Sequence, residues 1–268
     1  MAERVNPGEQ ARLLQQAESE LMGWEQPQAH LREALAQDHL HLYGQPIVSL
    51  TGSRSMVEIL VRMREEEALM LPPGEFLPAF AHYRMMAELD RWVACHAARA
   101  FRPGERYAAV SVNASTQSIE EPGFADYAAS QLLEAGLDPS ALIFEIDEGD
   151  ALDRPDAAAR FAGEVRAVGC RLMLDGFAQR AVTFDPLKRL RVDFVKVDGS
   201  VIRKIGRSGS AAAKLKAIVR VGELAGIGVV AECVEEAAIV AALKKSGVGY
   251  AQGFGVGKPE PIEKLFER

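Results

Sequence analysis

The feature that most constrains the fold is a regular alternation between short apolar runs and segments of helical length. The alternation continues from about residue 39 to the C-terminal region. This order is typical of β/α units and argues against a sandwich or a helix bundle. We expect strands near residues 40–48, 56–63, 107–113, 141–146, 171–175, 193–197, 228–232 and 250–252, and helices over 76–101, 121–135, 156–168, 183–190, 211–225 and 236–246.

Eight strands with intervening helices predict an α/β fold, a modified TIM-like (β/α)8 barrel with an N-terminal helical extension. A chain of 268 residues has room for one barrel of roughly 200–250 residues and a short extension. We assign residues 29–268 to the barrel and 1–28 to a helical extension or linker. Helical spacing of apolar residues predicts a helix within 8–37, interrupted near Pro27. That helix packs on the barrel or on a second copy, or it is a linker from an upstream domain.

Seven of the apolar runs end in, or just before, a polar residue that could bind a metal ion or a phosphate. In a barrel of parallel strands the C-terminal strand ends lie at one rim, so residues distant in sequence become neighbours there. We therefore place the candidate site at that rim. The residues are Glu58, Asn113, Glu145, Asp175, Lys196, Glu232 and Gln252.

Composition excludes several classes of protein. A net charge of -7 argues against binding to nucleic acid polymers, which requires a basic surface, but is compatible with a small anion held by a metal ion. Cys95, Cys170 and Cys233 lack the paired spacing of a disulfide framework or a zinc site, which favours a reducing, cytoplasmic setting. We expect Cys233 to be a small buried residue. No apolar stretch approaches the ~20 residues of a membrane span.

Several short motifs together resemble the EAL domain, a bacterial module that binds or hydrolyses cyclic di-GMP. The tripeptide that names the family reads Glu58-Ile59-Leu60 here, with Arg62 after it and Gln45-Pro46-Ile47-Val48 before it. The agreement extends over residues 29–265. It continues in order with Phe76-Leu77-Pro78, Leu89-Asp90-Arg91-Trp92-Val93, Ser111-Val112-Asn113-Ala114-Ser115, Phe144-Glu145-Ile146-Asp147-Glu148, Leu187-Lys188-Arg189-Leu190, Val195-Lys196-Val197-Asp198, Ala231-Glu232-Cys233-Val234-Glu235 and Gln252-Gly253-Phe254.

The resemblance implies a metal-dependent site. Hydrolysis of a phosphodiester needs an activated water and charge stabilisation, which two divalent cations can supply, and Mg²⁺ or Mn²⁺ prefers oxygen ligands. By resemblance, the first cation would be held by Glu58, Asn113, Glu145 and Asp175. The second would be held by Asp175, Glu232 and the residue at position 176.

The resemblance also implies roles for residues beyond the metal ligands. Lys196 would orient or activate the attacking water, with Glu232, Glu235 and Gln252 supporting the same end of the site. The nucleotide would contact Gln45, Leu60, Arg62, Pro78 and Gln252, with Arg62 bonded to phosphate. Leu60, Pro78 and Asp90 are equally well explained as an apolar wall, a turn and a structural ion pair. Glu148 corresponds to the glutamate that anchors the loop after the fifth strand.

One departure from the family lies at the metal site. Active members carry Asp-Asp-Phe-Gly-Thr-Gly, whereas this chain reads Asp175-Gly176-Phe177-Ala178-Gln179-Arg180. Gly176 offers no side chain, so we expect one cation site to remain and the second to be impaired. Ala178 and Arg180 replace glycines, so we expect the loop to take another path and Glu148 to lack its usual partner. Ala81 and Arg84 replace a glutamate and a glycine of the family.

These features favour a degenerate EAL domain that binds cyclic di-GMP as a receptor with little or no hydrolysis, its catalytic residues Lys196, Glu232 and Glu235 being vestigial. Two alternatives stay open: a slow phosphodiesterase that yields linear pGpG, and a protein-interaction module that is independent of the nucleotide. An unrelated barrel enzyme that stabilises an anion with one metal has little support. The expected partners are cyclic di-GMP, an unidentified effector protein and a second copy in a homodimer.

Overall fold

The computed structural model describes residues 23–24, 26–37, 39–66, 69–104, 106–179 and 182–266. The chain divides into a smaller unit, Met1–His41 with Val61–Leu89, and a larger unit, Leu42–Leu60 with Asp90–Arg268. The candidate site lies in the larger unit. Most of the extension expected over residues 1–28, and Arg180 of the loop after Asp175, lie outside the described residues.

Eight strands close into a barrel, as predicted, and all eight predicted strands are present. In order around the barrel, β1 pairs with β9, followed by β8, β7, β6, β5, β4 and β2, and β2 returns to β1. The strands are β1 (Leu40–Ser49), β2 (Ser55–Glu66), β4 (Tyr107–Asn113), β5 (Leu142–Asp147), β6 (Arg171–Phe177), β7 (Phe194–Val197), β8 (Gly228–Ala231) and β9 (Tyr250–Ala251).

β1 departs from the parallel strands of a regular β/α barrel. β1 pairs antiparallel with β9, Val48 opposite Ala251, whereas the pairs from β2 round to β9 are parallel. The connection from β1 to β2, residues 50–54, explains the difference. A parallel crossover needs about a dozen residues or more, so two paired strands joined by so short a turn cannot run parallel.

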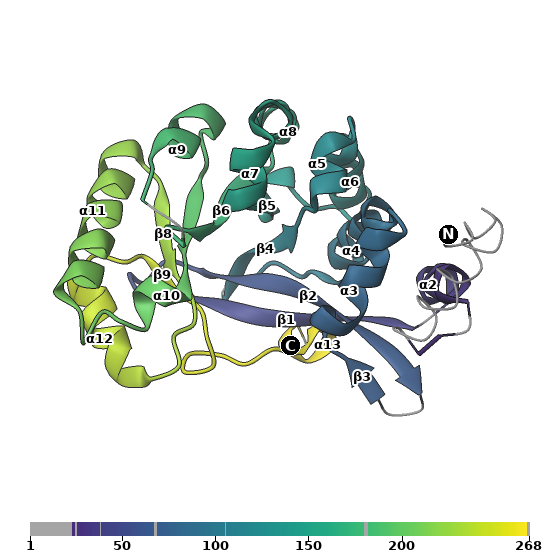
Figure 1. Cartoon of the computed structure of the whole chain (residues 1–268), viewed down its shortest axis with the longest axis horizontal. Coiled ribbons are helices and arrows are strands. Elements are labelled where there is room, and N and C mark those ends of the chain that lie inside the picture. The colour runs from purple at the N-terminus through teal and green to yellow at the C-terminus, as the bar shows by residue number, and fades with distance from the viewer. Residues whose placement is uncertain are drawn as a thin grey trace, which may run out of the picture. The chain divides into compact units, whose positions relative to one another are not determined.

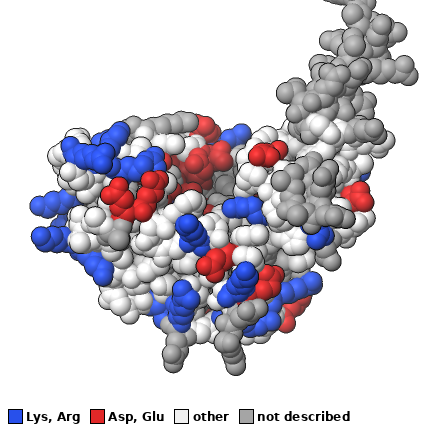
Figure 2. All heavy atoms as spheres, turned by 90° about the horizontal axis from the view of Figure 1, so that it is seen from below, with Lys and Arg blue, Asp and Glu red and all other residues white. Residues whose placement is uncertain are grey.

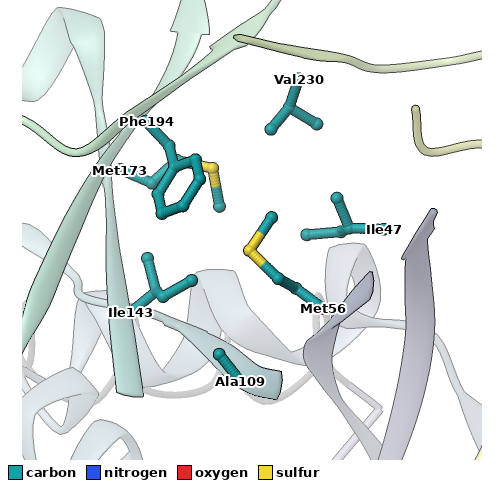
Figure 3. Close-up of a cluster of buried hydrophobic side chains, with 7 residues drawn as sticks. All are labelled: Ile47, Met56, Ala109, Ile143, Met173, Phe194 and Val230. Carbon is teal, nitrogen blue, oxygen red and sulfur yellow. The ribbon is translucent and has the colours of Figure 1, made fainter. Parts of the chain in front are cut away.

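The barrel interior is filled by one apolar residue from each of seven strands. Figure 3 shows these side chains pointing toward one another from the surrounding strands, and each is buried. Tyr250 of β9 packs against the same cluster. This layer closes the barrel beneath the polar strand ends and gives the site a rigid, dry floor. The seven residues are Ile47, Met56, Ala109, Ile143, Met173, Phe194 and Val230.

Helices cover the outside of the strands in the larger unit, as Figure 1 shows for α8, α9 and α11. Outward-facing Phe144 of β5 packs edge-on against Phe124 and Phe161, with ring centroids 5.5 Å and 5.4 Å away. The helices are α4 (Met86–Ala100, which begins in the smaller unit), α5 (Thr116–Glu120), α6 (Phe124–Glu134), α7 (Glu148–Asp153), α8 (Pro155–Ala167), α9 (Asp185–Leu190), α10 (Gly199–Ile202), α11 (Gly209–Ala225), α12 (Ala237–Lys245) and α13 (Ile262–Phe266).

The C-terminal segment packs against the start of the barrel. β10 (Glu260–Pro261) pairs antiparallel with β1. Gly44 of β1 allows this close packing, because a Cβ at this position would lie 2.7 Å from Cγ1 of Val57 and closer still to Leu265 of α13, so that these side chains would have to shift. Elsewhere in the larger unit, η1 (Pro139–Ala141) forms a short 3-10 helix before β5. The predicted helices over 121–135, 156–168, 183–190, 211–225 and 236–246 correspond to α6, α8, α9, α11 and α12.

The smaller unit contains α2 (Pro27–Ala36), β3 (Leu69–Leu71) and α3 (Pro73–His82). β3 pairs antiparallel with the end of β2, and α2 contacts α3. The helix expected over 76–101 is wrong in one respect, because it is two helices, α3 and α4. Arg84 separates them at φ 56°, a left-handed angle that ends a helix. None of the described helices is long and apolar enough to cross a membrane.

Candidate functional site

Seven predicted site residues line one pocket in the larger unit, with a volume of about 270 Å³. They come from β1, β2, β6, β7 and the segments after β8 and β9, so the fold brings together residues that are more than two hundred positions apart in sequence. These residues are Gln45, Glu58, Asp175, Lys196, Glu232, Glu235 and Gln252. Cys233, Gly253 and Phe254 complete the described lining.

Lys196 lies at the centre of the carboxylates. Its side chain is 2% exposed, and its Nζ lies 3.1 Å from Oε2 of Glu58 and 3.7 Å from Oδ1 of Asp175. It also donates to Oε2 of Glu145. Burial opposes the charge of Lys196, but the three carboxylates outweigh burial and raise its pKa well above the usual value. Lys196 is therefore a fixed ammonium ion that neutralises part of a buried anionic cluster.

Glu58 is held by amides as well as by the ammonium group. Oε2 accepts a hydrogen bond from Nε2 of Gln252 at 2.5 Å, and Oε1 accepts one from Nδ2 of Asn113 at 3.1 Å. Nε2 of Gln252 also lies 3.4 Å from Oε1 of Gln45. Burial would raise the pKa of Glu58, yet Lys196 and these amides together lower it. Glu58 is thus ionised and locked in one orientation.

Glu145 and Asp175 are carboxylates of the cluster whose ionisation is opposed by their surroundings. Burial, with the charge of Glu58 acting in the same direction, raises the pKa of Glu145 to about 8 despite Lys196. Burial also raises the pKa of Asp175, with Lys196 opposing it. Oε1 of Glu145 and Oδ1 of Asp175 are buried and accept no hydrogen bond. One ammonium ion serves three carboxylates, so two buried oxygen atoms have unused capacity.

Glu232 forms the neighbouring corner of the pocket. Its Oε1 accepts a hydrogen bond from the backbone N–H of Gly199 at 2.6 Å. Burial, followed by the charge of Asp175, raises the pKa of Glu232 to about 7. Glu232 therefore exchanges a proton in the neutral range, which suits a group that binds a cation or moves a proton.

The donor set fits one divalent cation. Glu58, Asn113, Glu145 and Asp175 offer carboxylate and amide oxygens, the ligands that Mg²⁺ and Mn²⁺ prefer, and the unused oxygens of Glu145 and Asp175 match that demand. In the described part of the chain, however, no three acidic, imidazole or thiol side chains already converge on one cation position. Nζ of Lys196 stands between the carboxylates, so these side chains must rearrange for a cation to bind.

A second cation would have fewer ligands. Gly176 follows Asp175 with φ 65° and contributes no side chain, so of the ligands expected for the second cation only Asp175 and Glu232 offer a carboxylate. A Cβ at position 176 would lie 3.4 Å from Oδ2 of Asp147, so a larger residue fits there without a severe clash. The position is therefore short of a ligand but not closed.

The expectation that Ala178 avoids the angles of a glycine is wrong. Ala178 has φ 69°, and its backbone N–H donates to Oε2 of Glu148 at 3.1 Å. This hydrogen bond, together with complete burial of the side chain of Phe177, holds the strained residue in place. Glu148 therefore accepts a hydrogen bond from this loop, and its role as the anchor of the loop stays a prediction.

Other predicted residues lie outside the pocket lining. Leu60 is not part of it, and Arg62 and Pro78 belong to β2 and α3 of the smaller unit, so their nucleotide contacts stay predictions. Asp90 forms no ion pair among the described residues. Its Oδ2 accepts hydrogen bonds from N of Ser115 at 2.8 Å and Oγ of Ser118 at 2.7 Å, and burial raises its pKa to about 6.

Cys233 and Phe254 are pocket residues that the sequence did not identify. Cys233 was expected to be buried, but it is partly exposed, lines the pocket and has φ 54°. The motif Gln252-Gly253-Phe254 was visible in the sequence, but periodicity says nothing about a ring at a pocket wall. Only the path of the backbone after β8 and β9 places both residues there.

The raised pKa values predict that cation binding releases protons. In the metal-free protein Glu145, with pKa about 8, is mostly protonated at pH 7, and it must ionise to bind a cation. Affinity for Mn²⁺ should therefore rise from pH 6 to pH 9, with about one proton released per cation at pH 7 and almost none at pH 9. Calorimetric titration in buffers of different ionisation enthalpy measures this number. Proton release that is unchanged in Glu145→Gln would contradict the assignment.

Comparison with known sequences agrees with the motifs. A sequence model of the family described as EAL domain matches residues 28–259. The cyclic di-GMP phosphodiesterase PdeB of Shewanella oneidensis is 29% identical over 243 residues, which covers 89% of this chain and 28% of PdeB. The chain thus spans less than a third of the length of that relative.

Solved structures share the fold and carry ligands. The MucR phosphodiesterase of Pseudomonas aeruginosa in complex with c-di-GMP aligns with a TM-score of 0.81 and 30% identity, over 90% of this chain and 99% of that one. BlrP1 of Klebsiella pneumoniae, in a complex with manganese and cyclic di-GMP, aligns with a TM-score of 0.73 and 27% identity, over 84% and 56%. Homologous structures therefore bind this dinucleotide, one of them together with a divalent metal.

Proposed function

Because the chain belongs to the EAL domain family, we propose that it is a receptor for cyclic di-GMP that hydrolyses the dinucleotide slowly or not at all. One observation carries the proposal: Gly176 stands where a metal-binding carboxylate is expected, while Glu58, Asp175, Lys196 and Gln252 still line one pocket. One Mg²⁺ or Mn²⁺ beside the dinucleotide satisfies the donors that remain. One divalent cation stabilises the negative charge on the leaving oxygen less than two cations do, so hydrolysis would be slow.

In this proposal each side chain has a task that the metal does not perform. Lys196 holds the carboxylates together and places a positive charge near the bound phosphate. Gln45 and Gln252 orient the ligand by hydrogen bonds. Leu60, Arg62 and Pro78 supply further contacts to the nucleotide, and Glu235 lies at the exposed edge of the pocket. When bound, the cation screens the phosphate charge and polarises its oxygens.

The receptor would signal by a shift in population. A ligand that binds one conformation more tightly favours that conformation. The contact between Glu148 and Ala178 couples the site loop to α7, so this loop is the element that we expect to respond. An effector protein or a second copy of the chain would read the change. Residues 29–268 act as the ligand-binding part in this scheme, and residues 1–28 as an extension or linker.

Nucleic acid polymers are poor candidates for the ligand. Figure 2 shows that Lys and Arg side chains are interspersed with Asp and Glu on the face in view. Together with the net charge of -7, this mixed surface offers little counterion release to a polyanion. A small, doubly charged dinucleotide bound at one cation is the better match.

Two measurements on the same protein test the proposal. Calorimetric titration with cyclic di-GMP and Mg²⁺ should show saturable binding, and chromatography after incubation with Mn²⁺ should show little linear pGpG. Absence of binding with and without metal would reject the receptor and leave an interaction module that is independent of the nucleotide. Rapid formation of pGpG would instead favour the phosphodiesterase.

A slow phosphodiesterase remains the second candidate on one observation. Lys196, Glu232 and Glu235 line the same pocket as Asp175, and the pKa of Glu232, raised to about 7 by burial, suits proton transfer at neutral pH. Multiple turnovers that are abolished by Glu232→Gln would support this candidate.

A further inference from the structure

One level of the barrel interior supplies most of the charged residues of the site. Side chains along a strand point alternately to its two faces. The residue two positions beyond each parallel-strand member of the apolar layer in Figure 3 therefore also points inward, one level closer to the pocket. Of the six residues at this level, Ser111 is the one that has no task in the site described so far. The six are Glu58, Ser111, Glu145, Asp175, Lys196 and Glu232.

The hydroxyl group of Ser111 is buried without a hydrogen-bond partner. Ser111 is 0% exposed, and its Oγ makes no hydrogen bond with any described residue. A buried hydroxyl group that lacks a hydrogen bond is destabilising, and alanine would fill nearly the same space without that cost. Hydrogen bonding among the described residues therefore gives no reason for a serine rather than an alanine at this position.

Glu145 on the neighbouring strand has the matching unused oxygen. Its Oε1 is buried and accepts no hydrogen bond from a described residue, whereas its Oε2 is bonded to Lys196. In the pairing of β4 with β5, Ser111 lies opposite Ile143. Glu145 is two positions farther along β5, so it lies on the same face and diagonally across from the hydroxyl group. A change of side-chain rotamer can bring the two groups together.

The other carboxylates of the cluster are poorer partners for Ser111. Both oxygens of Glu58 already accept hydrogen bonds, Oε1 from Asn113 and Oε2 from Gln252. Asp175 lies on β6, and β5 separates that strand from β4. Glu145 is therefore the carboxylate that combines a free oxygen with a place beside Ser111.

We propose that Ser111 is a positioning residue for the cation site: its hydroxyl group donates a hydrogen bond to Glu145 when this carboxylate turns from Lys196 toward a metal ion. Groups that bind metal ions are commonly fixed in orientation by a further hydrogen bond of this kind. Ser111 acts through Glu145 and contacts neither the metal ion nor the dinucleotide. The inference rests on the proposed function, because it concerns the cation of the same site.

Calorimetric titration of the chelator-treated protein with Mn²⁺ tests the proposal. Ser111→Ala should bind Mn²⁺ about 10- to 100-fold more weakly, which is the usual effect of removing such a hydrogen bond. In a Glu145→Ala background the same substitution should change the affinity by less than about twofold, because the hydroxyl group acts through the carboxylate. Ser130→Ala is the matched control: its hydroxyl group donates to O of Tyr127 within α6, outside the pocket, so Mn²⁺ affinity should not change.

The stability of the metal-free protein separates positioning from a purely structural role. The hydroxyl group has no partner among the described residues, so the urea midpoint of chelator-treated Ser111→Ala should equal or exceed that of the original protein. A lower midpoint would show that the hydroxyl group supports the fold itself and would overturn the proposal.

The Mn²⁺ titrations also separate this inference from the function on which it rests. If the original protein binds no Mn²⁺, the proposed cation site fails and the role of Ser111 fails with it. If the original protein binds Mn²⁺ and Ser111→Ala binds it equally well, the positioning role is wrong while the receptor stands. A loss of affinity that is equally large without Glu145 would also contradict the role.

Discussion

Replacing Lys196 with methionine is expected to lower the free energy of unfolding of the metal-free protein by about 3–5 kcal/mol at pH 8. Methionine fills similar space but removes the ammonium ion that contacts Glu58, Glu145 and Asp175. Two buried carboxylates, Glu58 and Glu145, and the partly exposed carboxylate of Asp175 are then left without a counterion. Urea denaturation of chelator-treated protein measures the loss.

The dependence of stability on pH and on Mn²⁺ distinguishes a loss of stability caused by the missing charge from one caused by poor packing of the methionine. The folded-state pKa values of the carboxylates would lie above their unfolded values, so the folded state would bind more protons, and the variant should gain stability as the pH falls from 8 to 5. Mn²⁺ should also restore stability, because a divalent cation can replace the lost charge.

Lys188→Met provides the matched control for this variant. Lys188 is 79% exposed and lies 3.9 Å from Asp185, so its removal should change stability by less than about 0.5 kcal/mol. A Lys196→Met protein that is as stable as the control, or that Mn²⁺ does not rescue, would show that the ammonium group is not what holds the carboxylates together.

Replacing Gly176 with aspartate is expected to raise hydrolysis of cyclic di-GMP by about 100-fold or more, because a second cation adds stabilisation at the reacting phosphate. The backbone tolerates the change: φ is 65°, in a region that aspartate enters more readily than most residues, at a cost of about 1 kcal/mol. Formation of pGpG with Mn²⁺, followed by chromatography, measures the gain.

Gly176→Asn is the control for shape and backbone strain, because asparagine has the same size without the charge. The new side chain begins 3.4 Å from Oδ2 of Asp147, so part of the benefit depends on a cation that screens the two carboxylates from each other. A gain that is equal in the asparagine variant would mean that the loop, and not the missing carboxylate, limits hydrolysis. No gain in either would show that position 176 is not the limiting part.

The sequence predicted the barrel because each strand satisfies a local rule. Runs such as those around Ile143 and Met173 are apolar on both faces, as expected of strands between a packed interior and covering helices. The direction of β1 was missed because direction depends on the connection to β2 and not on the composition of the strand. The prediction of a single helix over 76–101 was wrong because the chain breaks the helix at Arg84. A positive φ at a residue other than glycine cannot be recognised from an amphipathic pattern.

The site was predictable to the level of residue types but not of contacts. Strand-end positions identified Glu58, Asp175 and Glu232, and the pocket unites them. The sequence did not reveal that Lys196 occupies the space between the carboxylates. That position depends on which side chains from different strands point into the barrel at the same level along its axis. Ala178 failed for a similar reason: its hydrogen bond to Glu148 outweighs a local preference that sequence rules treat in isolation.

The number of cations bound beside the dinucleotide tests the central claim most directly. Crystals grown with cyclic di-GMP and saturating Mn²⁺, measured at the manganese absorption edge, report the occupancy of each position. We predict one fully occupied position, next to Glu58 and Asp175, and at most weak occupancy next to Gly176. Two fully occupied positions in the unmodified protein would contradict the account.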